Sequence, residues 1–369
     1  MKFLVLPILI CAMQLYSQNK NDDFLKEGDS FYVGTYTGGD SEGIYKYRLK
    51  ADGTIHKIGL AAKSENPSFL TLSHDKRFLL AANEINSENG MGTVESFLIK
   101  GDSLSLINKK TSGGAHPCYI STNASNYVLT ANYSSGNIGL LKLNDQGVLS
   151  KLLDVQQHFG KGTTERQTEP HAHFSKFDFD NKAVISVDLG TNQLWFSILD
   201  TLQQKLLPAT PNKLSMANGA GPRHLAFHPN KKWIYVINEL DCTVTLIKKN
   251  NESIYEKGGA VSTLPKNYTA PNTSADIHIS SDGKFLYTSN RGHNSIAIFK
   301  VNMKNGDLKL IGHASTKGDG PRNFSLSPDG GYLLVANQNS NNIVSFKRNK
   351  DTGELQYVDQ IDVPMPVCI

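Results

Sequence analysis

The sequence predicts an all-β protein, a seven-bladed β-propeller whose first blade is completed by the C-terminal strand. Three observations predict it. A unit of about fifty residues recurs along the chain. Each unit holds short β-rich runs separated by turn signals, and no window beyond the N-terminus shows the 3.6-residue period of a helix. This period fits the four-stranded blade of a propeller better than a helical repeat.

The N-terminus has the pattern of a secretory signal. Lys2 precedes an apolar run from Phe3 to Leu15, and a small polar stretch follows around Ser17. The run is shorter than the ~20 apolar residues of a membrane span. We therefore expect residues 1–18 to be a signal peptide, 19–30 a linker and 31–369 the propeller. The mature protein is expected to be exported, to the periplasm, and to be independent of the membrane once the signal is removed.

Residues 31–60 contain only part of a repeat unit. The runs 31–37, 43–49 and 54–60 match its second, third and fourth strands, with no first strand before them. The C-terminal residues 366–369 match the missing first strand and lie where the next unit should begin. Pairing of the two chain ends would close the ring and leave no exposed sheet edge there.

Six complete units lie between these ends. Each has an apolar first run, a turn and a second strand that ends in Ala-Asn or a similar pair. The six starts are 47 to 53 residues apart, at Pro67, Pro117, Pro170, Pro222, Ser274 and Pro321. Together with the divided unit they give seven blades.

Composition narrows the classes of function. The 38 basic and 34 acidic residues leave a net charge of only +4, and they are scattered, so nucleic-acid binding has little support. Beyond the signal, Cys118, Cys242 and Cys368 are odd in number and widely spaced, which indicates neither a disulfide framework nor a zinc knuckle. We expect no cofactor, a monomer and a small-molecule partner.

The propeller topology brings distant polar residues together. First strands line the channel of a propeller, so the residue after each leading position should meet the residue that ends the next strand. The first set is Ser68, Cys118, His171, Arg223, Ala275 or Asp276, Arg322 and Val367. The second set is Tyr36, Glu84, Tyr133, Asp188, Glu239, Arg291 and Gln338. By strand alternation, His173 should share a face with His171, whereas His224 and His278 should pack between strands.

Three interpretations of this ring compete. Arginines beside a histidine or glutamate suit an anion-binding site with acid–base groups. His171 and His173 with a carboxylate suit a metal, although Arg223 and Arg322 would repel a cation there. The third interpretation is structural: the polar side chains of the ring satisfy one another's hydrogen bonds and bind no ligand. The asparagines that recur at one position of the unit, by contrast, are expected to make hydrogen bonds within or between blades.

Four strings indicate a family. They are VGTYT at 33–37, EPHAH at 169–173, GPRH at 221–224 and PVC at 366–368. In these the chain resembles the lactonase group of seven-bladed propellers, which includes bacterial 6-phosphogluconolactonases and fungal 3-carboxy-cis,cis-muconate lactonizing enzymes. The resemblance covers residues 31–369. It implies metal-independent chemistry on a lactone by one histidine, two arginines and a glutamate: His171 or His173, Arg223, Arg291 and Glu239.

From this resemblance we expect the protein to be a carboxylic ester hydrolase, a 6-phosphogluconolactonase-like lactonase that acts on a sugar lactone. Arg223 and Arg291 are expected to bind the carbonyl oxygen and a substrate anion, and Glu239 or the histidine to activate water. The ring adds Arg322, Gln338 and Tyr36 as substrate-binding residues. A phosphogluconolactonase of sugar-phosphate metabolism should be cytoplasmic, whereas this chain is expected to be exported. The identity of the lactone therefore stays open. A muconate-type cycloisomerase and a non-catalytic periplasmic binding or scaffold propeller remain alternatives.

Overall fold

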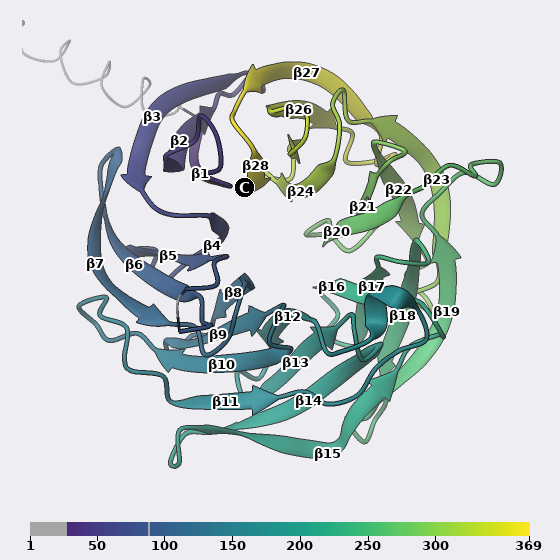
Figure 1. The fold of residues 1–369 in the computed structure, drawn as a ribbon. Coiled ribbons are helices and arrows are strands. Elements are labelled where there is room, and N and C mark those ends of the chain that lie inside the picture. The colour runs from purple at the N-terminus through teal and green to yellow at the C-terminus, as the bar shows by residue number, and fades with distance from the viewer. Residues whose placement is uncertain (1–27, 88) are drawn as a thin grey trace, which may run out of the picture.

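A computed structural model of the chain is a closed ring of seven four-stranded antiparallel sheets around a central axis (Figure 1). The structure describes residues 28–87 and 89–369. The predicted signal peptide and most of the predicted linker lie outside the described residues. The described part of the chain contains no helix with the length and hydropathy of a membrane span. The predicted fold class is confirmed.

Both chain ends build the first blade, as the sequence predicts. β28 pairs antiparallel with β1, Gly34 opposite Cys368 and Thr35 opposite Pro366. β1 begins at Asp29, which pairs with Leu49 of β2, so the blade begins slightly before residue 31. From the channel outward, blade 1 is β28 (Pro366–Cys368), β1 (Asp29–Thr35), β2 (Gly43–Leu49) and β3 (Ile55–Lys63).

The other six blades follow in chain order, each with its first strand at the channel. Blade 2 is β4 (Pro67–Leu72), β5 (Phe78–Asn83), β6 (Thr93–Lys100) and β7 (Ser103–Thr111). Blade 3 is β8 (Pro117–Thr122), β9 (Tyr127–Asn132), β10 (Asn137–Lys142) and β11 (Asp154–Gln157). Blade 4 is β12 (Ala172–Phe177), β13 (Ala183–Asp188), β14 (Gln193–Asp200) and β15 (Lys205–Ser215). A 3-10 turn, η1 (Glu165–Gln167), precedes it.

Blades 5 to 7 complete the ring. Blade 5 is β16 (Pro222–Phe227), β17 (Trp233–Asn238), β18 (Thr243–Lys249) and β19 (Tyr255–Ser262). Blade 6 is β20 (Thr273–Ile279), β21 (Phe285–Arg291), β22 (Ser295–Val301) and β23 (Leu308–Ser315). Blade 7 is β24 (Pro321–Leu326), β25 (Tyr332–Asn337), β26 (Asn342–Arg348) and β27 (Leu355–Asp362).

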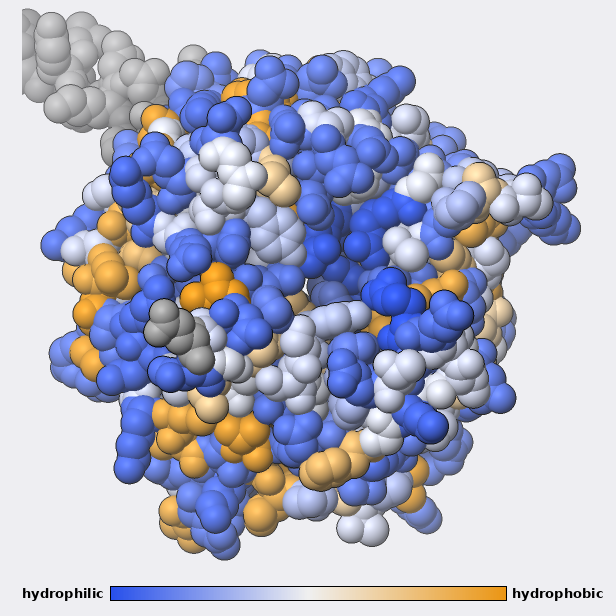
Figure 2. Space-filling model, viewed as in Figure 1, coloured by the Kyte–Doolittle hydropathy of each residue, from blue (hydrophilic) through white to orange (hydrophobic). Residues whose placement is uncertain are grey.

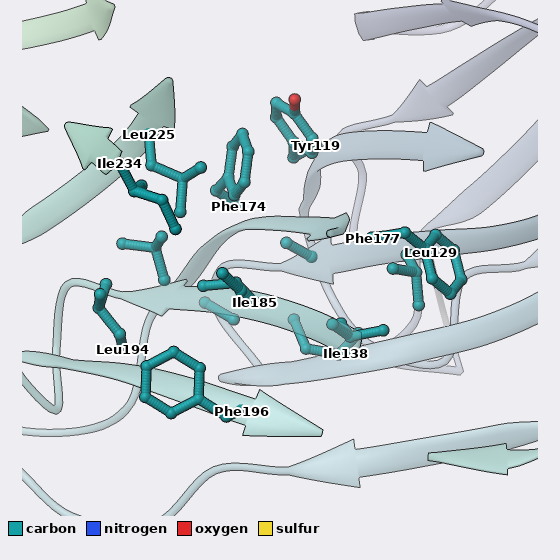
Figure 3. Packing of buried hydrophobic residues seen from close by; sticks show 14 of the residues in the cluster. Tyr119, Leu129, Ile138, Phe174, Phe177, Ile185, Leu194, Phe196, Leu225 and Ile234 are labelled. Carbon is teal, nitrogen blue, oxygen red and sulfur yellow. The ribbon is translucent and has the colours of Figure 1, made fainter. Parts of the chain in front are cut away.

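The hydrophobic core lies between neighbouring blades. Figure 3 shows part of a cluster in which Leu129 of blade 3, Ile185 of blade 4 and Ile234 of blade 5 are all buried. Each such side chain contributes about 1.5–3 kcal/mol on burial. Inner strands are apolar on both faces because each face packs on a blade, as in the fully buried β5, whereas outer strands such as β19 are mostly exposed. The blades therefore hold one another in place.

Four of the recurring asparagines bind their blade to the connection that enters it, whereas Asn238 donates to Thr243 and Thr245 within its own blade. Asn132 Nδ2 donates to the Ser112 carbonyl oxygen at 3.1 Å, and Asn337 Nδ2 donates to that of Thr316 at 3.0 Å. Asn83 and Asn290 make the same kind of bond. These side chains are fully buried. The predicted hydrogen-bonding role is confirmed at these positions, which fixes the inner strands around the channel.

Candidate active site

A pocket of about 230 Å³ lies at the mouth of the central channel. Figure 2 shows a hollow at the centre of this face with hydrophilic residues around it. Its wall combines residues that end second strands with residues near the start of first strands, as predicted. The first group is Tyr36, Glu84, Tyr133, Glu239 and Arg291, and the second is Cys118, His173, Arg223 and Arg322. Segments from all seven blades therefore meet in one polar pocket.

A β-bulge near the start of every first strand aims these side chains. In blade 5, Pro222 pairs with Asn238 and His224 pairs with Ile237, which leaves Arg223 between them without a partner on β17. Register shifts at the equivalent place leave Ser68, Cys118, His173, Arg322 and Val367 unpaired, and in blade 6 both Ala275 and Asp276. A bulge bends the strand and re-aims the extra side chain, here toward the channel.

The bulge also corrects one prediction. Strict alternation placed His224 away from the channel, but His224 and Arg223 both line a small cavity inside it. The extra residue breaks the two-residue period, so consecutive side chains reach the channel. The expectation for His278 fails in part, because its ring bonds Asp276 and its side chain is 38% exposed.

Glu239 is the centre of the charged cluster. Its Oε2 lies 2.9 Å from Arg223 Nε and 3.0 Å from Arg291, and its Oε1 lies 3.3 Å from Arg166. Burial alone would raise the pKa of Glu239, but the charges of Arg291, Arg223 and Arg166 hold it below its usual value. Glu239 is therefore an ionised anchor for arginines and a poor proton acceptor.

The arginines differ in how far they reach the pocket. The Arg223 side chain is only 2% exposed, and burial together with Arg291 lowers its pKa to about 10, so it remains charged. The Arg291 side chain is 21% exposed. Each guanidinium has five N–H donors, so contact with Glu239 leaves others free for an oxyanion.

The opposite wall is held more loosely. Tyr36 donates its hydroxyl to Glu84 Oε2 at 2.8 Å, and the Arg322 guanidinium lies 3.8 Å from the same oxygen. Arg322 also lies over the Tyr36 ring, 5.4 Å from its centroid. With four arginines and two glutamates in the wall, the pocket has an excess of cationic side chains. Such a pocket suits an anionic ligand.

The two predicted histidines take different places. His173 lines the pocket, and burial followed by the charges of Arg223, His224 and Arg322 lowers its pKa well below the usual value, so it is neutral at pH 7. His171 lies outside the wall and stacks on Tyr133 with ring centroids 4.4 Å apart. His173 meets the same ring edge-on. Of the two histidines, His173 is therefore the one that belongs to the pocket wall.

Three further ring residues stand apart from the pocket. Asp188 binds His158 Nδ1 at 2.7 Å and accepts the backbone N–H of His171, so it supports the chain before β12. Gln338 is half-buried and is not part of the pocket wall, where Arg322 represents blade 7. Ser68 lines the smaller cavity below the pocket. In the described ranges, no group of three or more metal-ligating side chains is placed to hold an ion.

Sequence reasoning missed Arg166. This residue lies in η1, within the connection between blades 3 and 4, and its guanidinium contacts Tyr133 Oη at 3.1 Å as well as Glu239. It occupies no recurring position of the repeat, so the ring argument could not include it. The long polar stretch between β11 and β12 was the available signal, because extended loops at a propeller mouth often carry binding residues.

Comparisons with known proteins agree on one family. Residues 30–369 match the model described as "Lactonase, 7-bladed beta-propeller". A 6-phosphogluconolactonase of Bacillus subtilis is 37% identical over 298 residues, 79% of this chain and 83% of that protein. One of Formosa agariphila is 35% identical over 306 residues, 80% of this chain and 85% of that protein. The structure of the periplasmic gluconolactonase of Pseudomonas aeruginosa aligns with a TM-score of 0.87 at 29% identity, over 92% of this chain and 98% of that one.

Proposed function

We propose that this chain, which belongs to the lactonase family of seven-bladed β-propellers, hydrolyses the ring ester of a sugar lactone in the pocket at its channel mouth. The family resemblance read from the four strings is confirmed. The observation that carries the proposal is the Glu239 cluster: one buried carboxylate holds three guanidinium groups beside the neutral His173. A scaffold has no need of such a group in the wall of a pocket.

Arg223 and Arg291 are assigned to the carbonyl oxygen. Lactone hydrolysis builds negative charge on that oxygen, and donors already aimed at it lower the barrier. Glu239 fixes both guanidinium groups, so little reorganisation is needed when the charge develops.

His173 is assigned as the general base. Both carboxylate oxygens of Glu239 already bind guanidinium groups, whereas His173 is neutral and keeps a lone pair that can take a proton. His173 removes a proton from water as the oxygen attacks the carbonyl carbon. The ring C–O bond then breaks, and the proton on His173 passes to the departing oxygen. The product acid ionises in solution, and no metal takes part in any step.

The substrate is assigned as an aldonolactone, with an anionic substituent accepted by the remaining arginines. Arg166 and Arg322 lie in the same wall and are not required for the carbonyl oxygen. The named relatives include 6-phosphogluconolactonases and a periplasmic gluconolactonase, so both forms of gluconolactone are the natural candidates.

The test is acid release from δ-gluconolactone and its 6-phosphate by the purified protein, measured in a pH-stat against the spontaneous rate. We expect acceleration by the wild type and a loss of ~10²–10³ in kcat in Arg291→Ala. Arg291 is chosen because it is less buried than Arg223, so the variant should fold. No acceleration with either lactone would overturn the proposal. Lactone formation from 3-carboxy-cis,cis-muconate would support the cycloisomerase instead.

Export is proposed on separate grounds. Residues 1–18 have the composition of a signal peptide, and a structure similar to this chain is that of a periplasmic gluconolactonase. N-terminal sequencing of the protein recovered from a periplasmic extract should begin after residue 18. Recovery only from the cytoplasm, with Met1 retained, would contradict export.

A further inference from the structure

A second and much smaller cavity lies directly below the pocket. It measures about 10 Å³, and Cys118, His173, Arg223 and Arg322 line both spaces. These four side chains therefore separate the pocket from the cavity. Ser68 and His224 belong to the cavity alone. Its volume is about the least that holds one water molecule.

Apart from Arg223 Nε, which faces Glu239 Oε2, three unpartnered polar atoms belong to the side chains around this cavity. Ser68 Oγ, His173 Nδ1 and His224 Nε2 are buried and have no hydrogen-bond partner within the described chain. The three residues are 4%, 5% and 4% exposed. Buried polar groups in native proteins almost always have a partner, which is often an ordered water. The three atoms supply the two to four partners that a buried water needs.

We propose that this cavity is a binding site for one water molecule, which links His173 of the pocket to His224 and Asp276 below it and so sets which ring nitrogen of His173 carries the proton. The site itself follows from the cavity and its unpartnered atoms. Its effect on catalysis rests on the proposed function.

The hydrogen bonds below the cavity determine the direction of the link. Asp276 Oδ1 lies 2.9 Å from His224 Nδ1, and Asp276 Oδ2 lies 3.0 Å from His278 Nε2 and 2.6 Å from Asn323 Nδ2. Burial alone would raise the pKa of Asp276, but the neighbouring His278 and His224 keep it below its usual value. An ionised carboxylate only accepts, so His224 Nδ1 carries the hydrogen and Nε2 presents a lone pair.

The tautomer of His173 follows from this order. The water donates one hydrogen to His224 Nε2 and the other to Ser68 Oγ, so it can only accept from its third partner, which is Nδ1–H of His173. The Nε2 of His173 then keeps its lone pair for the pocket above, which is the form that a general base needs. His224, Asp276 and Ser68 are accordingly positioning residues, which act on the substrate only through His173.

The first test needs no substrate. A crystal structure at high resolution should show one ordered water within hydrogen-bond distance of Ser68 Oγ, His173 Nδ1 and His224 Nε2. Nitrogen-15 NMR of histidine-labelled protein, with His173 assigned from the His173→Gln spectrum, should show a neutral ring protonated at Nδ1. An empty cavity, or a His173 protonated at Nε2, would overturn the proposal whatever the protein hydrolyses.

The second test uses a matched pair of variants. His224→Phe keeps an aromatic ring but removes both nitrogens, so the water loses Nε2 and Asp276 loses Nδ1, and we expect kcat to fall about 10- to 100-fold with KM nearly unchanged. His158→Phe is the control, because His158 makes a similar buried bond to Asp188 but lines neither cavity. It should lose stability without losing kcat or the His173 tautomer. Equal kcat values in the two variants would contradict the link.

Ser68→Ala is the second variant if His224→Phe does not fold. It removes one of three partners of the water from a small side chain, so kcat should fall about 2- to 10-fold and the His173 signal should shift toward a mixture of tautomers. An unchanged spectrum would contradict the role of the water. If the wild type hydrolyses neither lactone, the proposed function fails while the crystal and NMR results still decide the water site.

Discussion

The two walls of the pocket are each built around a glutamate, and they differ in how tightly it is held. Glu239, after β17, lies 2.9–3.3 Å from three guanidinium groups. Glu84, after β5, accepts the Tyr36 hydroxyl at 2.8 Å and lies 3.8 Å from Arg322. The contrast indicates that the two walls have different roles. The Glu239 wall is preorganised for charge that develops at a fixed point, and the Glu84 wall can adapt to the rest of the substrate.

Glu239→Gln should have the largest effect. The substitution keeps the size of the side chain but removes the charge that orients Arg223 and Arg291, so we expect kcat to fall ~10²–10³-fold. Acid release from δ-gluconolactone measures it, with circular dichroism as the control for folding. A folded variant with wild-type kcat would remove the distinction between the walls.

Glu84→Gln is the matched substitution on the other wall. Tyr36 keeps a hydrogen-bond acceptor, and Arg322 loses only a distant partner. We expect a change of at most about tenfold, expressed in KM rather than in kcat. A kcat loss as large as that of Glu239→Gln would show that both walls serve the reacting atoms.

Arg166→Ala should separate the two candidate substrates. The Arg166 side chain is 54% exposed, and Glu239 retains Arg223 and Arg291 without it. Arg166 can therefore exchange Glu239 for a substrate phosphate at little cost. We expect KM for the 6-phosphate lactone to rise about tenfold and that for the unphosphorylated lactone to stay within about twofold. The neighbouring Lys161→Ala is the control, and equal losses on both substrates would assign Arg166 to the reaction itself.

A lower pH should destabilise the folded protein, and this is the smallest of the expected effects. Burial, with the charge of Arg223, lowers the pKa of His224 from 6.5 to about 4. The unfolded chain therefore binds a proton that the folded chain excludes, and the stabilisation present above pH 6.5 is lost as the pH falls toward 4. The lowered pKa of Glu239 acts with the same sign at lower pH. We expect Tm to fall by on the order of 5 °C between pH 7 and pH 5, and by less in His224→Phe. An identical slope in both proteins would show that His224 does not contribute.

The ring and most of the pocket could be predicted from sequence because they depend on recurrence. The unit that starts at Pro67 returns at Pro321, and the partial units at the two ends complement each other, so the closing β28–β1 pair follows from counting. The strand-end residues Glu239 and Arg291 follow from the same count.

Features that the repeat pattern of the sequence does not encode could not be predicted. The bulge at the start of each first strand leaves no distinct signal in the residues, so strict alternation misplaced His224 and left His171 and His173 unresolved. Arg166 belongs to a connection outside the repeat. Gln338 occupies the right place in the repeat, yet it does not contribute to the wall. The repeat therefore specifies the scaffold, whereas the bulges and the connection that carries Arg166 determine which side chains line the pocket.

The most direct test of the central claim is a crystal structure with the hydrolysis product, 6-phosphogluconate or gluconate. The account predicts the product carboxylate in the channel-mouth pocket, within hydrogen-bond distance of Arg223 or Arg291 and beside His173. For 6-phosphogluconate it predicts the phosphate at Arg166 or Arg322. A product bound outside this pocket, with the Glu239 cluster untouched, would contradict it.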